Sequence, residues 1–205
     1  MINKILAGFL VLFLLGGGYH FYRIISVKKQ IKVIAQKDNI LFEEILTLDK
    51  KAPSMTFNEL FEKAKKQVEE REGMVVTLKM IDPYIFQDKI KAYSELLNSE
   101  NELVRLIAAN ARAMLTFNVK MEWANNSMDS LRNSSSYTLD FNANLSRKAI
   151  DEAKEAAAEW EKIKEGMKTT YNKLMPQEKR TQADGLVPKR DFIGLIETWA
   201  NKFAK

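Results

Sequence analysis

Few side chains in this sequence are of the types that perform acid, base or nucleophilic chemistry. The 205-residue chain has no cysteine, which excludes disulfides, thiolate nucleophiles, zinc fingers and iron–sulfur ligation within it. Its one histidine, His20, lies in an apolar segment, so the rest of the chain can form neither a Ser-His-Asp triad nor the Glu-x-x-His motifs of helical di-iron sites. These absences predict a protein that is not an enzyme and that has no catalytic metal and no cofactor.

The remaining charged side chains favour solvated helix faces over sites. Glu69, Glu70 and Glu72 are the one group of neighbouring carboxylates considered as metal ligands, but adjacent residues of a helix point in different directions. Between residues 148 and 168, opposite charges stand three residues apart, a spacing typical of an exposed helix surface. The sequence contains no Walker A pattern and no G-x-G-x-x-G pattern for binding phosphates.

The composition predicts a folded domain with a mild positive charge. Hydrophobic residues make up 46% and charged residues 29% of the chain, as in globular proteins. Lys and Arg number 32 against 27 Asp and Glu, for a net charge of +5, which weakly indicates an anionic surface such as phospholipid. No basic stretch is interleaved with stacking aromatic residues, so we expect no nucleic-acid partner.

An uncharged, largely apolar segment near the amino terminus predicts a transmembrane anchor. Residues 5–22 carry no charge, and a helix of that length covers roughly 27 Å, close to the thickness of a bilayer's hydrocarbon core. Aromatic and basic residues at its end are typical of a membrane–water interface. We therefore expect an anchor over residues 1–22. The residues expected at the interface are Tyr19, His20, Tyr22 and Arg23.

The alternative for this segment is a signal peptide over residues 1–18. Lys4 precedes an apolar stretch, and Gly16 and Gly18 have the spacing of a cleavage site. Against cleavage, a seam with alternating steps of three and four residues follows without a turn signal. Its positions are Ile24, Val27, Ile31, Ile34, Asp38, Leu41, Ile45 and Leu48. We therefore expect the anchor to be retained and to continue into a stalk helix over residues 23–52, whose seam contacts a second copy or another subunit.

The orientation of the anchor is almost evenly balanced. More basic residues follow the segment than precede it, and the positive-inside rule would then place the large domain in the cytoplasm. The order of a basic start, an apolar stretch and small residues is that of an export signal. We expect a single-pass protein of the cell membrane, with a slight preference for an extracytoplasmic (periplasmic) domain.

A helical bundle is predicted over residues 56–175. Thr56–Glu59 and Ser99–Glu102 match the capping box that begins a helix, and Asp82-Pro83 predicts another helix start. The stretch 74–81 is compatible with a strand, but a helix is favoured because a strand would need a partner.

The second half of the chain predicts a long helical hairpin. Two apolar rows of roughly thirty residues flank a polar connection at 133–138, and such a short connection predicts antiparallel neighbours. Pro176 is expected to end the second helix, which would make residues 176–191 a linker loop. An amphipathic pattern over residues 192–205 predicts a C-terminal helix.

Two polar residues interrupt apolar rows and are candidates for fixing the register of helix contacts. These are Asp38 in the stalk and Asn110 in the hairpin. Apolar positions of the hairpin are expected in the core, although they would also suit an adaptable binding groove. They are Met114, Phe117, Met121 and Trp123.

The sequence therefore predicts an all-α protein: an N-terminal transmembrane helix that continues into a stalk, followed by a helical bundle with a long antiparallel hairpin. Long apolar seams and the scarcity of catalytic residues favour a membrane-anchored structural or assembly subunit of a membrane-associated complex. Its expected partners are the lipid bilayer and other subunits or further copies, bound through helices. The alternative is a membrane-anchored helical sensor or small-ligand-binding domain; an enzyme using Asp, Glu, Lys or Tyr ranks third.

Overall fold

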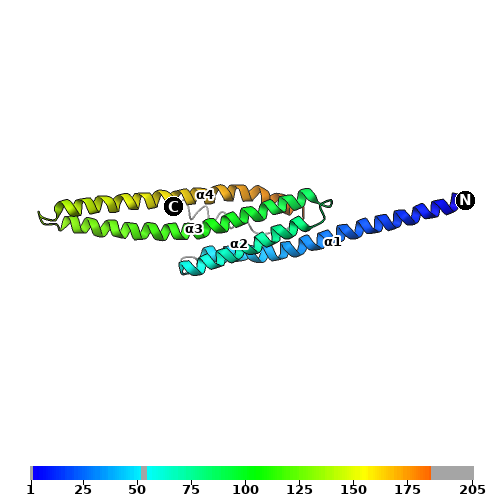
Figure 1. Ribbon diagram of the computed structural model, residues 1–205, viewed down its shortest axis with the longest axis horizontal. Helices are drawn as coiled ribbons and strands as arrows, with labels where there is room; N and C mark the ends of the chain where they lie inside the picture. Colours follow the sequence, from blue (N-terminus) through cyan, green and yellow to red (C-terminus); the bar gives the residue numbers. More distant parts are fainter. Residues whose placement is uncertain (1, 52–54, 186–205) are drawn as a thin grey trace.

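The computed structural model describes the backbone of residues 2–51 and 55–185, and the side chains of residues 16–44, 55, 56 and 58–185. It contains four helices, α1 (Ile2–Lys51), α2 (Phe57–Met80), α3 (Gln87–Arg132) and α4 (Leu139–Ala183), and no strand within those ranges (Figure 1). The predicted all-α class and helical bundle are confirmed.

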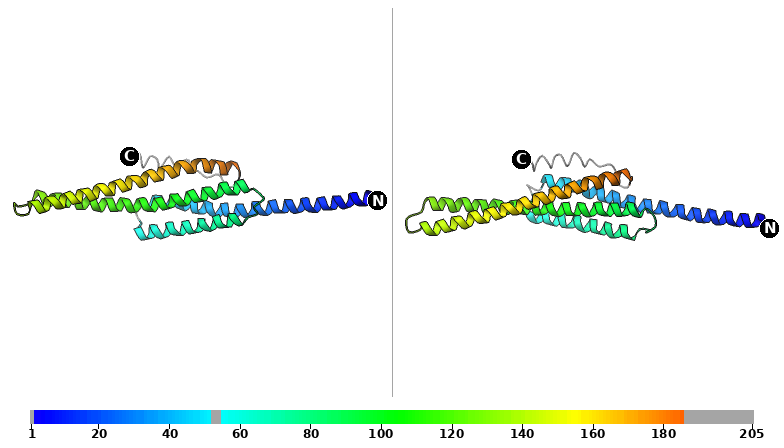
Figure 2. Two further views of the ribbon diagram at one scale, coloured as in Figure 1. Left: turned by 45° about the horizontal axis from the view of Figure 1, so that its top comes forward. Right: turned by 90° about the horizontal axis from the view of Figure 1, so that it is seen from above.

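The helices lie roughly along one axis and form an elongated molecule. α3 and α4 are an antiparallel hairpin, α2 lies along the first half of α3, and α1 runs beside α2 (Figure 1). The first part of α1 leaves the bundle at the end that holds the α2–α3 turn, whereas the hairpin tip lies at the opposite end in both views of Figure 2. The two ends of the molecule are therefore different in kind: one is a single helix and the other is a pair.

The core lies where α1, α2 and the first half of the hairpin overlap, because each of these helices carries an apolar row on one face. Each buried aliphatic side chain contributes roughly 1.5 to 3 kcal/mol relative to an exposed one. Members of this core include Val27, Ile31, Leu41, Val75, Leu78, Tyr93, Leu96, Leu97, Val104, Met167 and Leu174.

The expected stalk is a member of this bundle. Ile31 and Ile34, central to its seam, are 2% and 5% exposed, and both belong to the main core cluster. These seam positions are therefore covered within the chain, although Ile25, Val33 and Ile40 on other faces of α1 are exposed. Ile45 and Leu48 lie outside those side chains, and contact between the seam and another chain stays a prediction.

α2 begins and continues as its sequence predicts. The Glu59 amide donates to Thr56 Oγ1 at 3.3 Å, and the Thr56 amide donates to Glu59 Oε2 at 3.0 Å, so the capping box is complete. The helix passes through Gly73 and ends at Met80. The preference for a helix over a strand at residues 74–81 is thus confirmed up to its last residue.

The helix start predicted at Asp82-Pro83 is wrong. Asp82 Oδ1 accepts a hydrogen bond from the Tyr84 amide at 3.0 Å, which closes a turn two residues long rather than a helix. Phe86 then adopts a left-handed conformation with φ of 57°, and α3 begins after it at Gln87. An Asp-Pro pair serves turns as well as helix caps, and the local sequence does not separate the two uses.

The helix start predicted from the second capping box, Ser99–Glu102, is also wrong. α3 continues through these residues, and Ser99 Oγ donates to the Glu95 carbonyl at 3.0 Å within the helix. Ser99 and Glu100 are both buried. The apolar rows on either side share one register, so packing keeps the helix continuous where the local motif would begin a new one.

The hairpin is confirmed, but its second helix is longer than predicted. The polar residues 133–138 form the turn between α3 and α4, and α4 continues past Pro176 to Ala183. Proline removes one backbone hydrogen bond, yet the next turn is held by Thr181, whose buried hydroxyl donates to the Gln177 carbonyl at 3.0 Å. The expected linker is thus helical up to residue 183. Residues 186–191 and the expected C-terminal helix at 192–205 lie outside the described residues.

In the part of the chain that the structure describes, no helix combines the length and the apolar character needed to cross a membrane. The side chains of residues 1–15, which make up most of the expected anchor, lie outside that part, and the anchor stays a prediction.

Candidate functional site

A buried network of charged and polar side chains joins three helices at the centre of the bundle. α1 supplies Asp38, α2 supplies Arg71, and α3 supplies Tyr93 and Glu100. All four side chains are fully buried. The structure thus brings the polar residue of the α1 seam into contact with two residues that no sequence motif had connected to it.

Arg71 lies at the centre of this network. Its Nε donates to Asp38 Oδ1 at 3.3 Å and to Glu100 Oε2 at 3.1 Å, and its Nη1 reaches Gln67 Oε1 at 3.5 Å. The Tyr93 hydroxyl donates to Asp38 Oδ2 at 3.2 Å. The Asp38 carboxylate is thus stabilised both by a charged donor, the guanidinium, and by a neutral one, the tyrosine hydroxyl.

This burial favours a structural role for the network. A substrate needs access to the group that acts on it, and none of the four side chains of the network reaches solvent. Removing one partner of such a network leaves a buried charge uncompensated, which makes the relative placement of α1, α2 and α3 specific. The role proposed for Asp38, fixing the register of its seam, fits this geometry, with the partners found inside the chain.

A sequence signal for the partners exists in the apolar rows. Arg71 continues the steps of four and three that link Val68 to Val75, and Glu100 does the same between Leu97 and Val104. Both therefore occupy core positions of their helices. A charged residue at a core position predicts a buried counter-charge, and three such positions on three helices predict that they meet.

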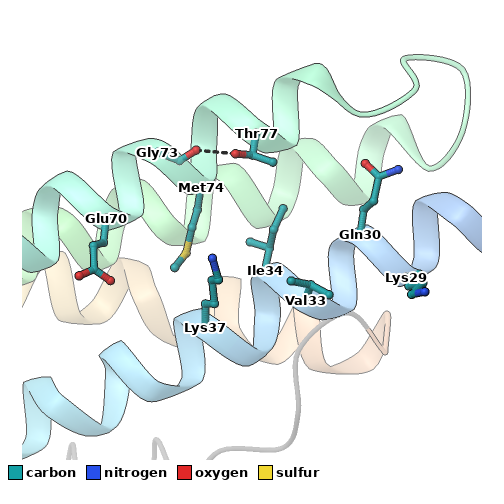
Figure 3. A pocket seen from close by; sticks show the side chains of 9 residues that line it. All are labelled: Lys29, Gln30, Val33, Ile34, Lys37, Glu70, Gly73, Met74 and Thr77. Carbon is teal, nitrogen blue, oxygen red and sulfur yellow. Dashed lines mark hydrogen bonds between the residues drawn. The ribbon is translucent and has the colours of Figure 1, made fainter.

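A groove lies between α1 and α2 on the outer side of the network. Its volume is about 540 Å³, within the range of small-ligand sites, although it is open along one side. Val33 and Ile34 of α1 and Met74 of α2 give it an apolar floor, and Lys29 and Lys37 stand along the α1 side (Figure 3).

Gly73 lines the groove on its α2 side. A Cβ at this position would meet no atom within 4 Å, so the missing side chain leaves space that is filled by nothing else. The Thr77 hydroxyl, which also lines the groove, donates to the Gly73 carbonyl at 2.8 Å (Figure 3). Glycine lowers helix stability by about 1 kcal/mol relative to alanine, and the packing around residue 73 leaves room for an alanine side chain.

An ion pair holds the α2–α3 turn to α1 at the point where α1 leaves the bundle. Arg23 Nε donates to Asp82 Oδ2 at 2.6 Å. This hydrogen bond, followed by that from the Tyr84 amide, holds the pKa of the Asp82 carboxyl below its usual value. Arg23 was expected at a membrane interface; the structure pairs it with this turn, and its position relative to a membrane stays a prediction. The other expected interface residues, Tyr19, His20 and Tyr22, are exposed on α1.

The distal half of the hairpin contains a second, smaller core. Ala124 of α3 packs with Ala149 and Ala153 of α4, which lets the two helix backbones approach closely. Nearer the bundle, Trp160 Nε1 donates to Asn110 Oδ1 at 2.8 Å. The second polar residue flagged in the sequence thus joins α3 to α4.

Apolar side chains that were expected in the core are partly exposed along this half of the hairpin. Met114 and Met121 are exposed, whereas Phe117 and Trp123 are half-buried. Of the helices that the structure describes, α3 and α4 alone extend to this level, so each has one apolar face covered by the other and another face that neither covers (Figure 1). Phe117 is sheltered by the Trp160 ring, with centroids 5.3 Å apart.

Within the described ranges, no three histidine or carboxylate side chains gather in a way that could hold a metal ion. The charges between residues 148 and 168 form surface pairs three residues apart, as predicted; they are Asp151–Lys154, Glu161–Lys164 and Glu165–Lys168.

Comparison with protein-family models, curated proteins and solved structures finds no significant match to this chain.

Proposed function

We propose that this chain is a membrane-anchored structural or assembly subunit, which presents the distal half of its α3–α4 hairpin to helices of other subunits or of further copies. The residue 1–22 segment supplies the anchor, α1 carries it directly into the bundle, and the hairpin extends from the opposite end. In this proposal the bundle holds the hairpin at a fixed position relative to the anchor, and the distal half of the hairpin binds the partner.

The exposure of large apolar side chains on the distal hairpin carries this proposal. Leu115 and Val119 of α3 are 53% and 55% exposed, and Phe141 of α4 is 71% exposed. A two-helix section covers one face of each helix, and its small alanine core contributes little burial. A further helix laid against the pair would bury these side chains, as in larger bundles.

The internal network supports the same function indirectly. A hairpin that binds partners must be held at a fixed angle to its anchor. The Arg71 contacts to Asp38 and Glu100 connect α1 to α3 through α2, using side chains that are fully buried. The position of the hairpin is therefore coupled to the helix that carries the proposed anchor.

Photo-crosslinking in the native membrane tests the function. A photoreactive residue at Val119 should capture another protein or a second copy, whereas the same residue at Glu155, an exposed polar position of the distal half of α4, should capture far less. Equal labelling at the two positions, or none at Val119 in membranes that hold the protein, contradicts the proposal. Comparison with position 155 distinguishes capture by a specific contact from capture by chance collisions in the membrane.

The α1–α2 groove favours a second candidate, a helical domain that binds a small amphiphile. An apolar floor beside Lys29 and Lys37 suits a ligand with an anionic group and a hydrocarbon part. Gly73→Leu adds a bulky side chain at a position that lines the groove, and its Cβ would meet no atom within 4 Å. Loss of a co-purifying amphiphile in this variant, with unchanged crosslinking at Val119, would establish the second function beside the first.

A further inference from the structure

The α2–α3 turn is fixed beside the point where α1 leaves the bundle. Asp82 uses one carboxylate oxygen to accept from Arg23 at 2.6 Å and the other to accept from the Tyr84 amide at 3.0 Å. The same carboxylate thus shapes the turn and holds it against α1. In both views of Figure 2 this turn lies at the end of the bundle from which the amino-terminal part of α1 projects.

Large apolar side chains at this end are left in water. Met80, the last residue of α2, is 79% exposed, and Tyr84 in the turn is 88% exposed. On α1, Tyr22 and Ile25 are exposed next to Arg23. These residues come from α1, α2 and the turn, and the ion pair between Arg23 and Asp82 brings their segments together.

Basic side chains accompany these apolar ones. Lys28 and Lys29 follow Arg23 on α1 by roughly 8 to 9 Å of helix, and Lys79 precedes Met80 on α2. None of these three lysines makes a salt bridge to another side chain that the structure describes. Lys28 lies over the Phe86 ring, with its Nζ 5.8 Å from the centroid, which leaves its charge without a described carboxylate partner. Exposed aromatic and aliphatic side chains beside such lysines are the chemistry of an interface with anionic phospholipid.

We infer that Met80 and Tyr84 enter the headgroup layer of an anionic membrane, and that Lys28, Lys29 and Lys79 bind its phosphate groups. The α2–α3 turn is then a peripheral membrane contact beside the transmembrane helix. The Arg23–Asp82 ion pair holds the turn at the level of Arg23 on α1 and so fixes how deeply the turn enters the headgroup layer. This inference rests on the proposed anchor. It adds that the bundle is seated on the bilayer and does not stand clear of it on a free stalk.

Spin labels on the full-length chain test the contact, because the absence of cysteine allows single labels to be placed. Tyr84→Cys reports the turn, Gly16→Cys reports the anchor, and Tyr137→Cys reports the exposed hairpin turn at the opposite end. Each variant is reconstituted into vesicles of phosphatidylcholine with or without phosphatidylserine. Collision of the label with oxygen and with a water-soluble nickel chelate is then measured.

We expect the labels at positions 16 and 84 to favour oxygen and the label at position 137 to favour the chelate. Removing phosphatidylserine should raise chelate access at position 84 several-fold and leave position 16 unchanged. A lipid-embedded label at 16 with a water-exposed label at 84 overturns the contact while the anchor stands, as does protection at 84 that is independent of phosphatidylserine. A water-exposed label at 16 overturns the anchor itself, and the contact with it.

Discussion

Replacing Arg71 should destabilise the bundle far more than replacing an equally placed surface arginine. In Arg71→Met, Asp38 and Glu100 lose hydrogen bonds of 3.3 and 3.1 Å from the same Nε, while both carboxylates stay buried. Hydrogen bonds to charged groups contribute about 1.5 to 3 kcal/mol each. Because the two carboxylates share the single N–H of Nε, the expected loss is taken instead from the about 3 to 5 kcal/mol that breaking a buried ion pair typically costs.

Arg105 provides a matched control, because its ion pair with Glu72 joins α2 to α3, as the Arg71–Glu100 pair does. Its Nη2 lies 2.7 Å from Glu72 Oε1, a shorter contact than either made by Arg71, but both side chains are more than half exposed. Solvent screening limits such a pair to about 0 to 1 kcal/mol. Arg105→Met should therefore be nearly neutral, although the distance alone would rank its interaction as the stronger.

The assay is urea unfolding in detergent micelles, followed by helical circular dichroism, for wild type and both variants. We expect Arg71→Met to lower the free energy of unfolding by about 3 to 5 kcal/mol and Arg105→Met by less than about 1 kcal/mol. If the two variants lose equal stability, burial does not set the contribution of the network and the reasoning is refuted. Combining Arg71→Met with Asp38→Leu and Glu100→Leu should recover most of the loss, since no charge is then left buried.

Three further predictions concern single contacts. Thr56→Ala should lower the free energy of unfolding by about 1 kcal/mol in the same assay, because α2 loses its cap; no change would show that the box is dispensable. Arg23→Gln should raise the pKa of Asp82, measured by NMR titration, since the arginine holds it low. Because the folded pKa is depressed, the stability from this pair is present above the unfolded carboxyl pKa of about 3.9 and is lost as the pH falls, so Arg23→Gln should lower thermal stability at neutral pH and not in acid. Asn110→Leu should lower the free energy of unfolding by about 1 kcal/mol and alter near-ultraviolet dichroism, because Trp160 loses its acceptor at 2.8 Å; an unchanged spectrum would count against this hydrogen bond.

The parts of the fold that could be predicted are those decided by local sequence. The Thr56 capping box needs only residues three apart, and the polar connection at 133–138 needs only a break between two apolar rows. Ser99 and Pro176 failed for the opposite reason. Each carries a local signal to begin or end a helix, but packing against neighbouring helices keeps the helix intact through both positions.

Of the buried network, one residue was singled out from the sequence, as a candidate for fixing the register of a seam. Asp38 was identified because it interrupts an apolar seam, which is a local pattern. Its partners lie 33 residues away at Arg71 and beyond, on other helices, and no spacing rule within one helix connects them. Burial of the seam residues Ile31 and Ile34 in the main core was also not predicted, because it depends on how the helices pack rather than on how each is patterned.

The central claim, that the distal hairpin assembles the protein with other helices, is tested most directly by particle mass in mild detergent. The account predicts that the wild type, extracted from its native membrane, has a mass well above that of one 23.6-kDa chain with its micelle. It also predicts that Val119→Asp combined with Phe141→Asp reduces this mass to one chain while helical dichroism stays unchanged, since both side chains are exposed. A wild type that is a single chain without any accompanying protein, or a double variant of undiminished mass, would contradict it.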